Sequence, residues 1–330
     1  MVKSLSYHQL PKELNLKVLA HRRTLHAIPF TNTLKEDPYI ITLMKVFFNG
    51  EIVEESEAHI PFLDRGVLFG DGLFETIRAY GGKPFRLERH LSRLREGCRE
   101  LRLSGLPGDR EIEEALAELY GLNVSEGDAY MRITLTGGAY DGKRTLTRPS
   151  SPNILMVVKP YEGYPTELYE KGVRAVVSSI RRNEGSPLSR IKSNNYLDTI
   201  MAKHEAWERS ADDAIMLNGG GYLAEGTSSN LFLVKGEGVF TPDIACGLLP
   251  GVTRDTVLEL CEELGLAAES GFYTLDDLLG ADEAFLTVST AEIVPIAEVE
   301  GRAIGPSCPG PVTARLSLAY RELVREELGL

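Results

Sequence analysis

The stretch that sets the fold is residues 45–53, which read KVFFNGEIV. Two short apolar runs flank Asn49-Gly50, a pair favoured in the type I′ turns that join antiparallel strands. We therefore predict a β-hairpin here. Beyond it, predicted strands alternate with amphipathic helices such as residues 87–101, where Leu87, Leu91, Leu94 and Cys98 recur at helical spacing. The mixture predicts an α+β or α/β architecture.

Residues 1–43, which precede the hairpin, have a different character. They carry a net charge of +3, whereas the whole chain carries −12, and their apolar residues keep no sustained period. We expect an N-terminal extension outside the fold. Translation from an upstream start codon is the leading explanation, and a targeting or regulatory arm is the alternative. The three histidines of this segment are expected to be incidental rather than metal ligands.

The rest of the chain divides at a break rich in proline and glycine, KPYEGYP at residues 159–165. We predict a small N-terminal α/β domain over residues 44–159, a linker over 160–168 and a larger C-terminal domain over 169–330. In the second half, a helix is predicted over residues 194–208. Its inner face is expected to consist of Leu197, Ile200, Met201, His204 and Trp207.

Composition excludes several classes of function. The chain is 43% hydrophobic and 25% charged, which is typical of a globular protein rather than a disordered one. Its acidity argues against a nucleic-acid partner, and no apolar run is long enough to span a membrane. The four cysteines are far apart, so we predict no metal site and no disulfide framework, and we expect a cytoplasmic protein.

Three segments could together hold a phosphate beside a reactive lysine. Leu249–Arg254 leads into a predicted helix, whose N–H groups and positive end would stabilise an anion; an ordinary helix start with Thr253 as N-cap is the alternative. Glu225–Asn230 places a carboxylate before small polar residues, which fits a ligand site or a plain turn. Lys192 becomes a nucleophile only if burial or positive neighbours lower its pKa, and most lysines are simply solvated.

Six ordered segments strengthen this interpretation. They are Asp64–Glu75, His90–Leu94 (H-x-x-R-L), Lys192–Tyr196 (K-S-x-N-Y), Glu225–Asn230, Leu249–Arg254 and Ser289–Glu292 (S-T-A-E). Together they resemble the class IV aminotransferases, the pyridoxal-phosphate (PLP) enzymes of fold type IV, over residues 45–315. The family includes branched-chain aminotransferases, D-amino-acid aminotransferases and aminodeoxychorismate lyase. The resemblance implies a two-domain fold type IV enzyme, similar to D-amino-acid aminotransferase in fold, with PLP bound by the larger domain.

The resemblance also implies roles for individual residues. Lys192 is the catalytic residue, forming a Schiff base with PLP and moving the substrate proton. Glu225 pairs with the pyridine nitrogen, which keeps the ring an electron sink, and the fork of Arg93 binds the phosphate. The implied cofactor-binding residues are Arg93, Lys192, Tyr196, Glu225, Ser228, Val252, Thr253 and Ser289. The implied substrate-binding residues are Phe69, Phe74, Tyr130, Arg132, Thr290 and Ala291.

Substrate choice rests on a few positions. Leu135 and Thr136 stand where D-specific enzymes carry an arginine, whereas Tyr130 and Arg132 resemble the Tyr-x-Arg of bacterial branched-chain enzymes. We therefore expect transfer of the amino group of leucine, isoleucine or valine to 2-oxoglutarate. Thr76, where branched-chain enzymes commonly carry glycine, and Phe69, in place of a tyrosine, leave aminodeoxychorismate lyase or a D-amino-acid or other amine transaminase as alternatives. By analogy with the family we expect a homodimer with the active site near the interface.

Overall fold

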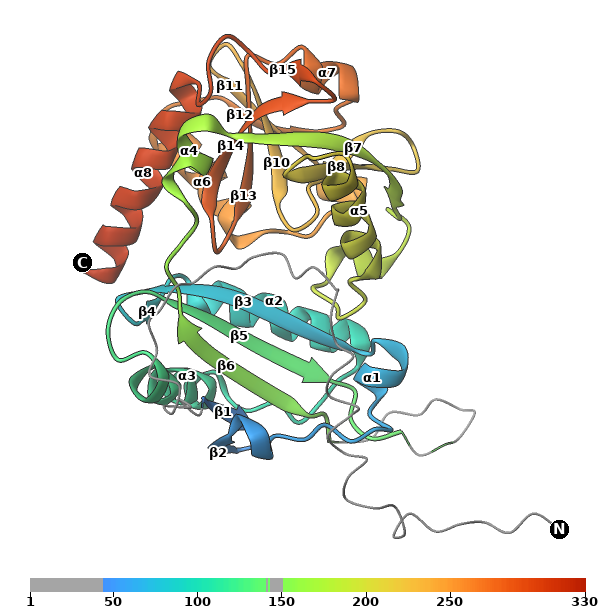
Figure 1. The fold of residues 1–330 in the computed structure, drawn as a ribbon, viewed down its shortest axis with the longest axis vertical. Coiled ribbons are helices and arrows are strands. Elements are labelled where there is room, and N and C mark those ends of the chain that lie inside the picture. The colour runs from blue at the N-terminus through green and yellow to red at the C-terminus, as the bar shows by residue number, and fades with distance from the viewer. Residues whose placement is uncertain (1–43, 141, 143–150) are drawn as a thin grey trace, which may run out of the picture. The chain divides into compact units, whose positions relative to one another are not determined.

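The computed structural model of the chain describes residues 44–140, 142 and 151–330. The prediction for residues 1–43 therefore lies outside the described residues. Two sheets organise the described part (Figure 1). None of its helices is both long and apolar enough to cross a bilayer, and no group of its acidic, histidine and cysteine side chains could hold a metal ion.

The first sheet has six strands in the order β2-β1-β6-β5-β3-β4. Its elements are β1 Lys45–Phe48, β2 Glu51–Glu54, a short 3-10 helix Glu55–Glu57, α1 Arg65–Phe69, β3 Gly72–Tyr80, β4 Lys83–Pro84, α2 Leu87–Leu101, α3 Asp109–Asn123, β5 Ala129–Thr136 and β6 Ile154–Pro160. The predicted hairpin is confirmed, with Asn49 and Gly50 both at positive φ in its turn. The predicted helix over residues 87–101 is confirmed with the same bounds.

Both faces of β3 are used, and they differ in character. Leu73, Ile77 and Ala79 are buried in a core that α2 and α3 complete (Figure 1). Residues of the opposite face, Phe74 and Thr76 among them, pair across the sheet with Thr134 and Arg132 of β5. Because side chains alternate along a strand, one face of β3 builds the core while the other is left for a site.

The second sheet has nine strands. Its path is β12-β11-β10-β13-β14-β7-β8-β9, with β15 beside β14, and β9 also pairs with β10. Its elements are α4 Thr166–Lys171, β7 Val173–Arg182, a 3-10 helix Pro187–Arg190, α5 Leu197–Glu208, β8 Asp213–Asn218, β9 Leu223–Glu225, β10 Asn230–Lys235, β11 Gly238–Pro242, a 3-10 helix Ile244–Cys246, α6 Val252–Glu263, β12 Ala268–Gly271, α7 Leu275–Leu279, β13 Glu283–Val288, β14 Glu292–Val299, β15 Arg302–Ala303 and α8 Pro311–Leu328. A core of residues from α6, α8 and the strands β10, β11, β13 and β14 includes the stacked rings of Phe232 and Phe285.

Helix α5 departs from the sequence prediction in start and in orientation. It begins at Leu197, and the five residues expected on its inner face, Leu197, Ile200, Met201, His204 and Trp207, are all exposed. The buried positions are instead Thr199, Ala202 and Ala206. Small side chains allow the helix to approach β7 and β8 closely, where Ala202 and Ala206 join one core cluster with Val176, Ala214 and Met216. The prediction of the inner face was wrong.

The predicted linker over residues 160–168 contains regular structure at both ends. Strand β6 extends through Pro160 and α4 begins at Thr166, so the stretch without helix or strand is residues 161–165. The division into two domains stays a prediction.

Candidate active site

Strand β3 and the loop before α5 bring Lys192 to its position. The Phe74 N–H donates to the Lys192 carbonyl at 2.9 Å, and the Asn194 N–H donates to the Gly72 carbonyl at 2.9 Å. A Cβ at Gly72 would collide with the Leu135 carbonyl oxygen of β5 and with the Asn194 side chain. Only glycine therefore lets β3 lie this close to both. The lysine is thus fixed by backbone pairing rather than by a flexible loop.

The ring of Phe74 contacts three side chains that were predicted for the site. The Lys192 Nζ is 4.6 Å from the ring centroid, and the Arg132 guanidinium carbon is 4.1 Å from it. The ring of Tyr196 meets that of Phe74 edge-on at 5.5 Å. Phe74, itself buried, therefore forms an apolar wall shared by a lysine, an arginine and a tyrosine predicted for the site.

This environment changes the ionisation of Lys192. Burial, followed by the charges of Arg93 and Arg132, lowers its pKa to about 8, although the carboxylates of Glu75 and Glu225 act in the opposite direction. Desolvation and like charge both disfavour an ammonium ion. Lys192 therefore has the property that a nucleophilic lysine needs and that an ordinary surface lysine lacks.

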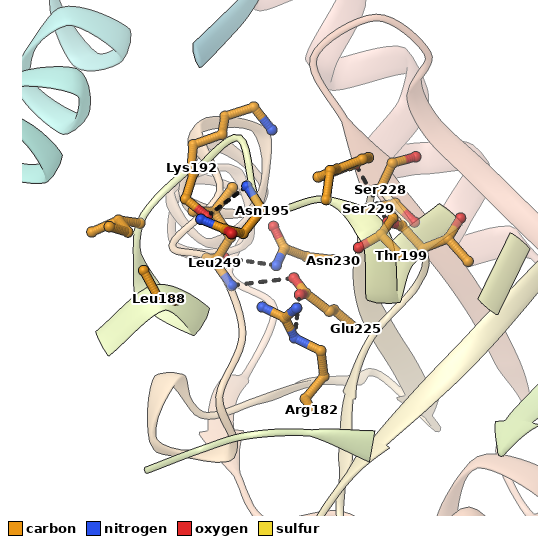
Figure 2. Close-up of a pocket in the computed structure, with 14 residues that line it drawn as sticks. Arg182, Leu188, Lys192, Asn195, Thr199, Glu225, Ser228, Ser229, Asn230 and Leu249 are labelled. Carbon is orange, nitrogen blue, oxygen red and sulfur yellow. Dashed lines mark hydrogen bonds and ion pairs between the residues drawn. The ribbon is translucent and has the colours of Figure 1, made fainter. Parts of the chain in front are cut away.

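Glu225 ends β9 beside two hydrogen-bond donors (Figure 2). The Arg182 Nε lies 3.0 Å from one carboxylate oxygen, and the Leu249 N–H donates to the other at 3.1 Å. Burial nevertheless raises the pKa of the Glu225 carboxyl, because these two partners do not fully offset the loss of water.

A second arginine and carboxylate lie near the start of α6. Arg93 donates to Glu75 through Nε at 2.8 Å and Nη2 at 2.7 Å, and through Nη1 to the Pro250 carbonyl at 2.7 Å. Glu75 is fully buried and also contacts His90 Nδ1 at 2.8 Å.

Helix α6 itself starts two residues earlier than the alternative interpretation required. Gly251 is the N-cap, with no side-chain cap, and Thr253 is a buried residue of the first turn. A Cβ on Gly251 would collide with the Asn230 side-chain oxygen, which explains why glycine occupies the cap. Thr253 as N-cap was therefore wrong, and the first-turn N–H groups are not covered by a capping side chain.

Two cavities that share Lys192 are lined by several of these residues, whereas Phe74, Tyr130 and Arg132 line neither of them. One is lined by Lys192, Tyr196, Glu225 and Ser228 among others, and the second by Arg93, Val252, Thr253, Ser289 and Thr290. Lys192 and Ser228 line both. Two buried hydroxyls on the walls, Ser229 Oγ and Thr287 Oγ1, find no hydrogen-bond partner among the described residues. Polar and ionisable groups that converge on a concave site are typical of small-molecule binding.

The predicted substrate residues are only partly brought together. Tyr130 and Arg132 lie on one face of β5, with Lys159 above the Tyr130 ring at 5.0 Å. Ser289 and Thr290 reach the second cavity, whereas Ala291 is buried and its N–H donates to the Val288 carbonyl at 3.2 Å. Phe69 is exposed at the end of α1, against Tyr140, and lines neither cavity.

Several residues at the site were missed by sequence reasoning. Glu75 and His90 lay inside quoted segments without a role, and Arg182 had no local signal because its partner Glu225 is far away in sequence. Arg78 could have been found, since it follows Phe74 and Thr76 at the alternating positions of β3. Its guanidinium reaches the Thr290 carbonyl at 3.3 Å.

Comparison with known proteins agrees with this geometry. Residues 72–299 match the family model described as amino-transferase class IV. The chain belongs to the class IV aminotransferases. Similar curated relatives include a putative branched-chain-amino-acid aminotransferase of Methanocaldococcus jannaschii, 36% identical over 85% of this chain and 96% of the relative. A D-alanine aminotransferase of Bacillus licheniformis is 36% identical over 86% and 98%, and an aminodeoxychorismate lyase of Bacillus subtilis is 35% identical over 85% and 94%.

Solved structures give the same family and its cofactor. The branched-chain amino acid aminotransferase of Thermobaculum terrenum in its PLP form has a TM-score of 0.76 and 31% identity, covering 86% of this chain and 94% of that one. Class IV aminotransferases are fold type IV enzymes that use PLP. The residues of this chain fit that group: a lysine of lowered pKa, a buried carboxylate, and an arginine beside an uncapped helix start all line the joined cavities.

Proposed function

We propose that this aminotransferase moves the amino group of branched-chain L-amino acids, leucine, isoleucine and valine, to 2-oxoglutarate. The observation that carries the proposal is Arg132. Its guanidinium lies against the Phe74 ring beside Lys192, its Nε donates to Thr134 Oγ1 at 3.1 Å, and no carboxylate among the described residues pairs with it. A partly buried cation without a counter-ion favours a substrate that brings one.

The residues around the Phe74 ring, beside Lys192, offer two kinds of contact to a substrate side chain. Phe74 and Tyr130 offer apolar surface to a branched-chain amino acid, and Arg132 offers a charge to the distal carboxylate of 2-oxoglutarate. A transaminase must accept both substrates in turn at one site. An apolar wall next to an arginine satisfies that need better than either feature alone.

Lys192 acts as the proton carrier in this proposal. PLP, when bound, supplies an electron sink that stabilises negative charge at the substrate Cα. Lys192 Nζ would take the proton from the substrate Cα and deliver it to the cofactor carbon, and in the second half-reaction it would deliver a proton to the Cα of the new amino acid. A pKa of about 8 lets the amine accept and donate a proton near neutral pH. Backbone pairing at Phe74 and Asn194 keeps the amine within reach throughout.

Three other groups hold the cofactor in this proposal. Glu225 would accept the ring N–H, while Arg182 and the Leu249 N–H keep its carboxylate oriented. Arg93 and the first-turn N–H groups at Val252 and Thr253 hold the phosphate, which the positive end of α6 also favours.

Tyr196, at the phenolic oxygen, and the side chains of Ser228 and Ser289 complete the proposed cofactor set. Burial raises the pKa of Tyr196 to about 12, so its hydroxyl remains a hydrogen-bond donor at neutral pH.

Aminodeoxychorismate lyase activity is the second candidate, and Thr76 favours it. The residue lines the second cavity beside Arg93 and Ser289, where it narrows the space next to Lys192. In that reaction the same lysine and cofactor release 4-aminobenzoate and pyruvate. Because Thr76 replaces the glycine common in branched-chain enzymes, specificity for a D-amino acid or another amine is a further alternative.

The test combines a spectrum with a substrate panel. The purified protein should carry the absorbance band of lysine-bound PLP, and Lys192→Ala should lose it. Leucine with 2-oxoglutarate should then yield glutamate, whereas a lyase releases pyruvate from aminodeoxychorismate. Survival of the band in Lys192→Ala would overturn the assignment of the lysine, and glutamate formed only from D-amino acids would overturn the substrate.

The exposed apolar residues support a homodimer. On α5, Leu197 and Trp207 are 66% and 67% exposed, and Phe62 and Val67 near α1 are 82% and 59% exposed. Apolar exposure of this extent marks contact surfaces, so we propose that a second copy covers it near the active site. Sedimentation should give twice the mass of one chain, and Trp207→Glu should shift it toward one.

Location in the cytoplasm is also proposed. It is supported by the four cysteines, which are all unpaired and of which Cys98, Cys246 and Cys261 are buried.

A further inference from the structure

The turn between β13 and β14, residues 289–291, contains Thr290 and Ala291, which were predicted to bind the substrate. Its backbone N–H groups are suited to bind the substrate α-carboxylate. Within this turn the Ala291 N–H is already donated to Val288. The N–H groups of Ser289 and Thr290 have no hydrogen-bond acceptor among the described residues, and both residues line the second cavity. Whether those two N–H groups face an incoming carboxylate depends on what fixes the turn.

The residue that ends the turn is Glu292, and its backbone is unusual. Its φ is +61°, a left-handed conformation that L residues other than glycine rarely adopt. The side chain is buried, yet it is a carboxylate. A buried charge in an unfavourable backbone conformation persists only where its surroundings hold it.

Three donors from two separate parts of the fold hold the Glu292 carboxylate. Arg78 Nη1 lies 3.0 Å and the Tyr80 hydroxyl 2.9 Å from Oε1, and Arg321 Nε lies 3.2 Å from Oε2. Arg78 and Tyr80 belong to β3, whereas Arg321 belongs to α8. The carboxylate therefore ties the end of the turn to the strand that also carries Phe74.

The same arginine reaches the turn directly. Arg78 Nη1 is shared between Glu292 and the Thr290 carbonyl, and the Tyr161 hydroxyl donates to that carbonyl at 2.9 Å. With the Thr290 carbonyl held on this side and the Ala291 N–H held by Val288, the peptide plane between them is fixed at both ends. Asp128, 2.8 Å from Arg78 Nη2, keeps the guanidinium in place.

We propose that Glu292 is a positioning residue: through Arg78 it holds the turn so that the N–H groups of Ser289 and Thr290 face the substrate α-carboxylate. The proposal rests on the proposed function, since it assumes a carboxylate-bearing substrate in this cavity. It predicts an effect on substrate binding in both half-reactions, because amino acid and oxo acid share the carboxylate. It predicts no effect on the cofactor, because Glu292 does not line either cavity.

The experiment compares Glu292→Gln with the wild-type holoenzyme. Four quantities are measured: kcat and KM for the reactive amino acid, the inhibition constant of its des-amino analogue, which is 4-methylpentanoate for leucine, and the dissociation constant of PLP. The KM and the inhibition constant should rise together by about tenfold, as expected for one lost charge-assisted hydrogen bond. The kcat and the affinity for PLP should stay unchanged. Glu298→Gln, on the same strand and partly exposed, is the matched control and should match wild type.

Two further variants keep the test decisive if Glu292→Gln does not fold. Tyr80→Phe and Arg321→Gln each remove one donor to the carboxylate and should raise the inhibition constant about threefold, as for a weaker hydrogen bond. An unchanged inhibition constant in the folded variants would overturn the proposal, and so would a parallel loss of PLP affinity, which marks general disruption. Failure of the proposed function is seen separately, in wild-type protein that forms no glutamate from leucine, isoleucine or valine.

Discussion

Two carboxylates near Lys192, the fully buried Glu75 and the partly buried Glu225, have opposite pKa shifts. Burial would raise the pKa of Glu75, but Arg93 and His90 outweigh it and lower the pKa to about 2. Burial also raises the pKa of Glu225, and there Arg182 and the Leu249 N–H do not reverse it.

The difference follows from the number of donors. Glu75 receives two hydrogen bonds from one guanidinium and contacts His90, whereas Glu225 has one arginine nitrogen and one backbone N–H.

This contrast separates two uses of a buried carboxylate. All strong donors near Glu75 come from the protein itself, so its task is to orient Arg93. Glu225 lines a cavity and is under-compensated, so a cationic group from a ligand would complete its surroundings. A carboxylate whose hydrogen-bond partners all come from the protein has a structural role. A carboxylate with too few such partners is available to bind a ligand.

The largest expected effect comes from neutralising the under-compensated carboxylate. Glu225→Gln removes the negative partner proposed for the cofactor ring nitrogen, and kcat should fall about a thousandfold, the upper range for losing one preorganised electrostatic partner. Thermal unfolding should shift little, because Arg182 keeps its hydrogen bonds to the Gly247 and Ser189 carbonyls. Steady-state kinetics and calorimetry measure the two quantities. Glu237→Gln, in an exposed turn, is the control, and equal kcat in both variants would refute the ligand role.

Neutralising the saturated carboxylate should act on stability instead. Glu75→Gln leaves Arg93 buried without its partner, and the free energy of unfolding should fall by about 3 kcal/mol at neutral pH. Denaturant unfolding at several pH values measures it.

The stabilisation by Glu75 should also depend on pH. Because the folded-state pKa of about 2 lies below the ordinary 4.5, the stabilisation is complete above pH 4.5 and is lost as the pH falls toward 2. The wild type and Glu75→Gln should therefore converge in acid, and a constant difference across that range would contradict the assignment.

The smallest expected effect is a shift in the pKa of Lys192, which the charges of Glu75 and Glu225 both raise. Capture of PLP by the cofactor-free protein requires the neutral amine, so its rate should rise with pH and level off above about 8. Removing either negative charge favours the neutral amine, so the midpoint should move to lower pH by a fraction of a unit in Glu75→Gln and Glu225→Gln. Stopped-flow absorbance across a pH series measures the midpoint, and a shift to higher pH would contradict the attribution.

The sequence predicted local elements well because their signals are local. The turn at Asn49-Gly50 and the apolar spacing of residues 87–101 place a hairpin and α2 correctly. The ordered segments also identified the family and its cofactor. The hairpin and α2 depend on residues a few positions apart, and the family is identified by several motifs that occur in the same order.

Orientation and pairing could not be predicted in the same way. The apolar spacing on α5 is helical, but periodicity does not say whether a face packs inside the chain, and here small residues took that place. Arg182 with Glu225, and Arg78 with Glu292, meet only after folding brings distant strands together. The donors that decide each pKa are therefore absent from any local pattern.

The alternation along β3 has a consequence for how this enzyme could evolve. Its odd-numbered side chains are committed to the core and to Arg93, while Phe74, Thr76, Arg78 and Tyr80 form the face toward the lysine and the β13–β14 turn. A replacement at Thr76 reshapes the cavity without entering the core. Substrate preference can thus drift by single substitutions on one side of a strand whose other side stays constant, which suits a family in which relatives of similar identity carry different activities.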